Sequence, residues 1–116
     1  MRLQTLATAL AGASAVLGAV HVALTPVLHP AWTVDALWFV GSGLAILVAA
    51  AANIICGQAT GARRQIALVV VNLAMSAFFA GAWLVLPEPQ VLVGGGLFLC
   101  LAGCSIASCW TADPAA

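Results

Sequence analysis

Charged side chains are almost absent from this sequence. They make up 5% of its 116 residues, and lysine does not occur at all. A soluble domain usually carries about 25% charged residues, so this chain has too little polar surface to cover a water-soluble globule. Its formal net charge of zero gives no electrostatic reason to expect nucleic acid as a partner.

Sequence signatures of catalysis are missing as well. The chain has four cysteines but no C-x-x-C motif, which argues against a thiol–disulfide enzyme. Its long uncharged stretches contain no acid–base pair and no nucleophile with a neighbouring base. We therefore expect a protein of non-enzymatic type.

What the sequence does contain is four long apolar stretches, in a chain that is 65% hydrophobic. Each is close to the ~20 residues that cross the hydrocarbon core of a bilayer as a helix. Helices are expected because lipid offers no hydrogen-bond partner to an exposed backbone amide. The sequence predicts an all-α fold, an integral membrane four-helix bundle of up-down-up-down order, in a single membrane domain over residues 1–116. The predicted helices run over about residues 3–24, 36–55, 65–86 and 91–110.

The distribution of the few charges predicts the orientation in the membrane. Arg2 precedes the first span, and Arg63 and Arg64 lie between the second and the third, while the other two loops hold Asp35 and Glu88. Cytoplasmic loops are enriched in Lys and Arg, so we expect both termini on the cytoplasmic side of a bacterial inner membrane. The first stretch also resembles a secretory signal, but it is long enough to span, so we expect it to be retained.

Prolines and possible caps predict the helix ends around the first loop. We expect the first helix to end near Thr25, because Pro26 disfavours helical geometry in the residue before it. The second helix is expected to begin at Pro30, or to be capped by Asp35.

Small residues recur at spacings of three and four along the spans, so they share one helix face. Helices pack in lipid through such faces because small side chains let backbones approach closely. We expect these faces to form the bundle interior. In the first helix the face comprises Ala7, Ala11, Ser14, Gly18, His21 and Thr25. The other faces are Gly41, Ala45, Ala49 and Ala52, then Asn72, Ser76, Phe79 and Trp83, and finally Gly96, Cys100, Gly103 and Ala107.

One polar and aromatic segment, HVALTPVLHPAWTVDALW at residues 21–38, interrupts the apolar pattern. His21 lies on the inward face of the first helix, and an ionisable residue inside a span is a candidate functional site. The candidate ligand-binding residues at the outer end are His21, His29, Trp32, Asp35, Trp38 and Glu88. Asn72 and Ser76, deeper in the bundle, complete the set of candidates.

Structural explanations exist for the same residues. Tryptophans near span ends form the aromatic belt, Asp35 can cap a helix, and His21 or Asn72 can form interhelical hydrogen bonds. Two histidines and a carboxylate can also bind zinc or another divalent ion, with His21, His29 and Asp35 as the candidate ligands. Haem is a weaker alternative, since His29 is expected in a loop. Nothing in the sequence requires a cofactor.

In length and number of spans the chain resembles the small multidrug resistance transporters. That family depends on a glutamate within the first helix, where this chain has only His21 as an ionisable residue, so no transport residue is carried over. The phrase LWFVGSGLA, after a short loop with Pro and Trp, and the Ala/Gly/Val-rich composition resemble small, uncharacterised four-span membrane proteins of high-GC bacteria. That resemblance covers about the first half of the chain and implies no activity.

The leading expectation is an accessory or assembly module of the cytoplasmic membrane, which packs as a homo-oligomer or against a larger membrane partner. On this hypothesis, Gly18→Leu and Gly103→Leu are expected to disrupt assembly. The first alternative is an outward-facing protein that binds or transports a small molecule, a lipid or a proton through His21 and residues 25–38. The second is a metal- or haem-binding membrane protein.

Overall fold

The computed structural model of the protein describes residues 2–58 and 61–111, and within them the chain forms four α-helices. These are α1 (Leu3–Leu28), α2 (Val34–Cys56), α3 (Ala62–Val85) and α4 (Pro89–Thr111). All four are long and apolar enough to cross a membrane. The all-α, four-helix prediction is confirmed, and this is the make-up of a multi-pass membrane protein.

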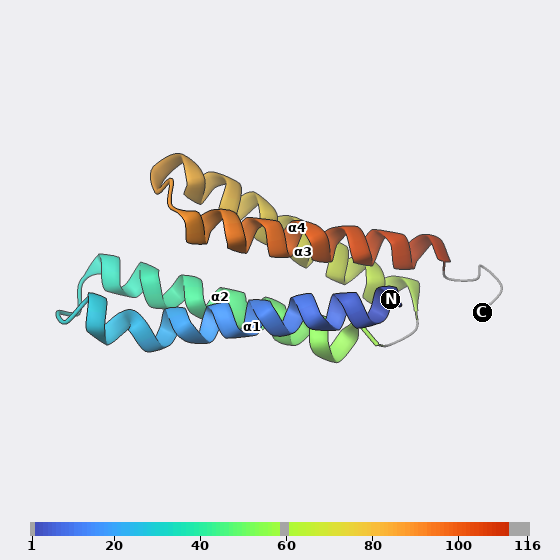
Figure 1. Ribbon diagram of the computed structural model, residues 1–116, viewed down its shortest axis with the longest axis horizontal. Helices are drawn as coiled ribbons and strands as arrows, with labels where there is room; N and C mark the ends of the chain where they lie inside the picture. The colour runs from blue at the N-terminus through green and yellow to red at the C-terminus, as the bar shows by residue number, and fades with distance from the viewer. Residues whose placement is uncertain (1, 59–60, 112–116) are drawn as a thin grey trace.

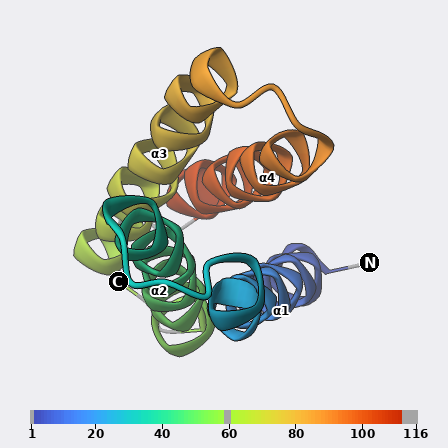
Figure 2. The same ribbon diagram turned by 90° about the vertical axis from the view of Figure 1, so that its left-hand side faces the viewer.

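The helices pair into two hairpins (Figure 1). α1 packs along α2 and α3 along α4, while fewer contacts between α1 and α4 and between α2 and α3 join the hairpins. The molecule is elongated, 55 Å long and 25 Å across in both other directions. The hairpins lie closest together near the N-terminus of α1 and diverge toward the loops at residues 29–33 and 86–88 (Figures 1 and 2).

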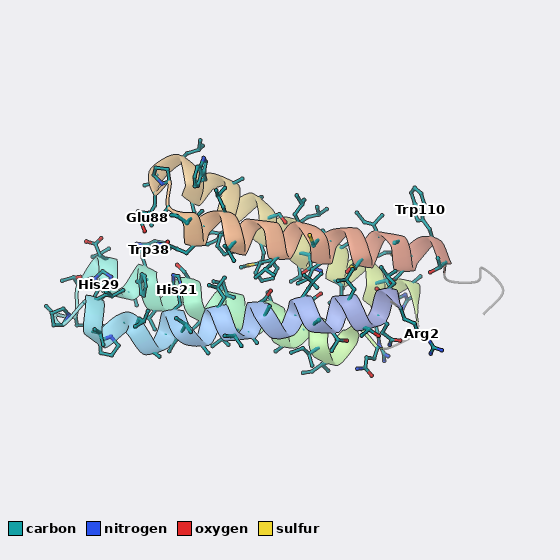
Figure 3. All side chains as sticks on the ribbon, viewed as in Figure 1. Arg2, His21, His29, Trp38, Glu88 and Trp110 are labelled. Atoms are coloured by element: carbon teal, nitrogen blue, oxygen red, sulfur yellow. The ribbon has the colours of Figure 1, made fainter. Side chains whose placement is uncertain are left out.

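Charges of opposite sign lie at opposite ends of this bundle. Arg2 precedes α1, and Arg63 and Arg64 lie in the first turn of α3. Asp35 lies in the first turn of α2 and Glu88 precedes α4, so both lie at the other end of the molecule (Figure 3). We call these the basic end and the acidic end.

The prediction that the first helix ends near Thr25 is wrong, because α1 continues past Pro26 to Leu28. Proline has no N–H, so the carbonyl of Val22 loses its regular helical partner. Side-chain and backbone bonds hold the turns around it: the Thr25 hydroxyl donates to the His21 carbonyl oxygen at 3.0 Å, and the His29 backbone N–H donates to the Thr25 carbonyl oxygen at 2.9 Å. Apolar spans tolerate proline where such bonds are available.

Neither predicted start of α2 is correct. The N-cap residue is Thr33, whose side-chain oxygen accepts a hydrogen bond from the Ala36 backbone N–H at 3.2 Å. Asp35 lies inside the first turn, where its charge is still favourable next to the positive end of the helix dipole. Pro30 stays in the loop, because the helix begins at Val34.

The predicted inward face is correct for α1 and for most of the α3 positions. The buried residues of α1 are Ala11, Ser14, Gly18 and Thr25. In α3, Asn72 and Phe79 are buried, whereas Trp83 is exposed. These faces combine small or ring-shaped side chains with at least one hydrogen-bonding group.

The predicted inward face of α4 is wrong, and in that of α2 only Ala49 is buried as predicted. The exposed positions include Ala45, Gly96, Cys100 and Gly103. The buried residues of α2 are Ala36, Gly43, Ile46, Ala49, Ala50 and Asn53. In α4 they are Val91, Gly94, Phe98, Leu101, Ala102, Cys104 and Ser105. Each of these faces includes one hydrogen-bonding side chain, Asn53 or Ser105, and a buried polar group needs a partner. That requirement, rather than small-residue spacing alone, sets which face turns inward.

Packing within each hairpin depends on a glycine where the helices approach closely. A Cβ atom at position 18 would lie 2.9 Å from the Gly43 carbonyl oxygen, and a Cβ at position 94 would overlap the Phe79 ring. Between the hairpins, an apolar core fills the middle of the bundle. Its buried members are Ala11, Ile46, Ala49, Phe79, Val91, Phe98 and Leu101.

Candidate functional site

Both histidines contact one phenyl ring. The ring centroids of His21 and Phe39 lie 4.3 Å apart with their planes at 17°, and those of His29 and Phe39 lie 5.1 Å apart at 50°. His21 lies in the last turns of α1 and His29 is its C-cap residue, and Phe39 contacts both from α2. Within the described residues neither imidazole makes a hydrogen bond. The two histidines are therefore linked by their common contact with the Phe39 ring and not by a hydrogen bond between them.

A cavity of about 300 Å³ lies beside His29 at the acidic end. It is lined by Val22, Thr25, Pro26, His29, Pro30, Trp32 and Val40. The end of α1 forms one wall, the loop with Pro30 and Trp32 forms another, Val40 contributes from α2, and the cavity is open on its remaining side. Most of the lining is apolar, with the imidazole of His29 and the hydroxyl of Thr25 as its polar side-chain groups.

Three other candidates at the acidic end do not line this cavity. Asp35 and Trp38 lie at the start of α2, and Trp38 is 70% exposed. Glu88 is on the other hairpin (Figure 3), where its carboxylate accepts a hydrogen bond from the side-chain amide of Gln90. An exposed tryptophan at a span end fits the aromatic belt, which accounts for Trp38 without a ligand.

Asn72 and Ser76 belong to a different cluster. The side-chain amides of Asn72 and Asn53 donate to each other's carbonyl oxygens at 2.9 and 2.8 Å. The Asn72 amide also donates to the Ser105 hydroxyl at 3.3 Å, and the Asn53 amide to the Ala49 carbonyl oxygen at 2.8 Å. The Ser76 hydroxyl donates to the backbone carbonyl of Asn72 at 2.8 Å. This cluster therefore connects α2, α3 and α4.

The Asn53–Asn72–Ser105 cluster is buried and complete. All three side chains are buried, and no buried side-chain nitrogen or oxygen among the described residues lacks a hydrogen-bond partner. Each buried side-chain nitrogen and oxygen of the cluster therefore has at least one partner inside the protein. Its geometry matches the interhelical hydrogen bonding that the sequence offers as a structural explanation of Asn72.

The candidate metal ligands do not come together. Among residues 2–58 and 61–111, no three His, Cys, Asp or Glu side chains gather closely enough to hold a metal ion. The contact that His21 and His29 share is the ring of Phe39, which donates no electron pair to a cation. The residues present therefore do not form the donor set that a zinc site needs.

Sequence reasoning missed two residues that organise these clusters. Phe39 lies on the same face of α2 as Gly43 and Ile46, four and seven residues further on, and this spacing is the available signal. Asn53 belongs to the same face, and an amide inside a span must find a partner. Starting the helical face from Asn53, instead of from the small residues, would have located both.

Comparison of the chain with protein-family models, with curated proteins and with solved structures finds no match.

Proposed function

We propose that this multi-pass membrane protein binds a small, largely apolar molecule in the cavity beside His29. The observation that carries the proposal is the cavity itself, whose volume is about 300 Å³. Sites for small molecules are typically concave, mostly apolar and about 300–1,000 Å³ in volume, with a few polar groups that orient the ligand. This cavity is at the lower end of that range, so the ligand is small.

The location of the cavity fits an outward-facing role. The three arginines lie at the basic end, and the positive-inside rule then orients that end toward the cytoplasm, with both termini inside. In a bacterial inner membrane, with the helices crossing in alternating directions, the acidic end faces outward. A ligand can then reach the cavity from the outer leaflet or from the adjacent water.

His29 supplies the polar group that contacts the ligand, Trp32 lines the cavity although 73% of it is exposed, and His21 acts indirectly. Stacking between His21 and Phe39 fixes the phenyl ring, and the same ring contacts His29 at the cavity wall. A side chain held on two sides loses little conformational entropy when a ligand arrives, which favours binding. His21 is thus a positioning residue in this proposal.

A single-tryptophan protein tests the binding proposal. Trp38→Phe, Trp83→Phe and Trp110→Phe leave Trp32 as the one fluorophore, and all three replaced side chains are exposed. A terminally brominated octane, added to this protein in lipid nanodiscs, is expected to quench Trp32 emission with a saturable component. A strictly linear response, as simple partition into lipid gives, contradicts the proposal.

Matched phenylalanine substitutions locate the binding to the cavity. Val40→Phe fills the cavity from α2, whereas Val48→Phe places the same ring on a side of that helix where valine is 70% exposed. The saturable quenching is expected to disappear in the first variant and to persist in the second. Equal quenching curves in the two variants would show that the brominated probe binds elsewhere.

Assembly with further copies of this chain is the second candidate function, and one observation favours it. α4 turns Gly96, Cys100 and Gly103 outward, and a Cβ atom added at either glycine meets nothing within 4 Å. A second helix can approach closely over such a surface. Comparison of Gly103→Leu with Gly18→Leu distinguishes an effect on assembly from an effect on folding. Gly103 lies outside the packed hairpin, whereas Gly18 lies inside it. Gly103→Leu should therefore lower the oligomer fraction in crosslinking and leave the fold intact. An unchanged oligomer in Gly103→Leu removes this candidate.

A further inference from the structure

The polar side-chain groups of the cavity, the Thr25 hydroxyl and the His29 imidazole, can both accept a hydrogen bond. The Thr25 hydroxyl donates its proton to the His21 carbonyl oxygen at 3.0 Å. Toward a ligand the Thr25 oxygen can therefore only accept a hydrogen bond. Within the part of the chain that the structure describes, the imidazole of His29 makes no hydrogen bond. A neutral imidazole has one acceptor nitrogen and one N–H donor.

The charges at the acidic end of the molecule disfavour an anionic ligand. The acidic end carries Asp35 and Glu88, while Arg2, Arg63 and Arg64 all belong to the basic end, and the chain has no lysine. A carboxylate or phosphate beside His29 would find no permanent cation at this end of the molecule, where the formal charges are negative. The ligand is therefore expected to be uncharged at its polar end.

We propose that the ligand of this cavity is a small neutral amphiphile with one terminal hydroxyl group. The inference rests on the proposed binding function and names the chemistry of its ligand. A hydroxyl group both donates and accepts. It can donate to the unprotonated nitrogen of the His29 imidazole or accept from its N–H, while its hydrocarbon part lies against Pro26, Pro30 and Trp32. An unsubstituted hydrocarbon leaves the imidazole of His29 without a hydrogen-bond partner.

Three probes with one brominated eight-carbon chain, added to the Trp32-only protein in nanodiscs, test this inference. They are terminally brominated octane, octanol and octanoate, and each is titrated at neutral pH with Trp32 quenching as the readout. Since one well-formed hydrogen bond changes affinity by up to about tenfold, the alcohol is expected to bind about tenfold more tightly than the hydrocarbon after correction for partition. The carboxylate is expected to bind most weakly.

Two variants test whether His29 causes the preference for the alcohol over the hydrocarbon. His29→Leu is expected to remove the preference for the alcohol while saturable quenching by bromo-octane remains. Ser42→Ala is the control, because Ser42 is a hydroxyl on the same hairpin that donates to the Trp38 carbonyl oxygen and does not line the cavity. It should keep the full preference.

The outcomes separate the two proposals. Equal affinities for alcohol and hydrocarbon, or tightest binding of the carboxylate, overturn the hydroxyl assignment and leave cavity binding in place. A preference for the alcohol that persists in His29→Leu overturns the role of His29 in recognising the hydroxyl group. Absence of saturable quenching with all three probes removes the binding function and this inference together.

Discussion

Replacing Asn53 and Asn72 with leucine, singly and together, tests whether their mutual amide pair holds the two hairpins in register. Asn72 makes three side-chain hydrogen bonds to α2 and α4. Interhelical hydrogen bonds in membrane proteins contribute about 0.6 kcal/mol on average and at most about 1.7 kcal/mol. Asn72→Leu is therefore expected to lower the free energy of unfolding by about 2–5 kcal/mol.

The pair itself is measured by the double-mutant cycle. Asn53→Leu already breaks both reciprocal bonds with Asn72, so the second substitution has less left to remove. We expect a coupling free energy of about 1–3 kcal/mol, the double variant being more stable than the sum of the single losses predicts. Unfolding of the purified protein by SDS in mixed micelles, followed by circular dichroism, supplies the free energies.

A second cycle serves as the control. Thr8 is exposed on α1, and its hydroxyl donates to the Gln4 carbonyl oxygen of its own helix. Thr8→Val and Asn72→Leu should therefore be additive within about 0.5 kcal/mol. If the Asn53–Asn72 cycle is also additive within about 0.5 kcal/mol, the amide pair does not couple the hairpins and the reasoning is refuted.

Three further pairs of substitutions test the packing and the capping of the helices, and the same SDS titration gives the free energy of unfolding of each variant. Gly18→Ala should lower the free energy of unfolding by about 1–3 kcal/mol, because the added Cβ meets the α2 backbone. Gly12→Ala, whose Cβ meets nothing within 4 Å, should be neutral or slightly stabilising. Equal effects of the two substitutions would argue against close packing at Gly18. Gly94→Ala should destabilise through overlap with the Phe79 ring, and Phe79→Leu should relieve part of that loss; no relief would place the strain elsewhere. Thr33→Val should cost about 1 kcal/mol by removing the α2 cap, and Thr33→Ser should retain most of it; identical losses would show that the hydroxyl does not cap.

The helices themselves could be predicted because the bilayer imposes their length and leaves few alternatives to helical hydrogen bonding. The helix ends were harder to predict, because the local conformational preferences of single residues compete with the need to satisfy backbone groups in the membrane. The preference against helix before Pro26 is small compared with the benefit of satisfying backbone groups in an apolar span. Thr33 and Asp35 both favour caps, and only the three-dimensional course of the loop decides between them.

The inward faces show where spacing alone is insufficient. Small residues allow close packing but do not require it, so Gly103 can lie outside the bundle. A buried amide requires a partner, and Asn53, Asn72 and Ser105 could supply one another. In α1 the small residues and the hydrogen-bonding residues share a face, which is why Ser14 and Thr25 were predicted correctly.

The site was partly predictable for the same reason. An intramembrane histidine draws attention to residues 21–38, and the cavity is built from this segment together with Val40. The contact of both histidines with Phe39 depends on how α1 and α2 pack, which no spacing within one helix reveals. Glu88 lies on the other hairpin (Figure 3), and the sequence does not fix how far the hairpins diverge.

Native mass spectrometry of the protein released gently from its own membrane tests the binding claim most directly. The wild-type chain is expected to carry the added mass of one small neutral organic molecule, and Val40→Phe, which fills the cavity, is expected to lack it, while Val48→Phe retains it. A bare chain mass for all three proteins, or the same adduct on all three, would contradict a ligand in the cavity beside His29.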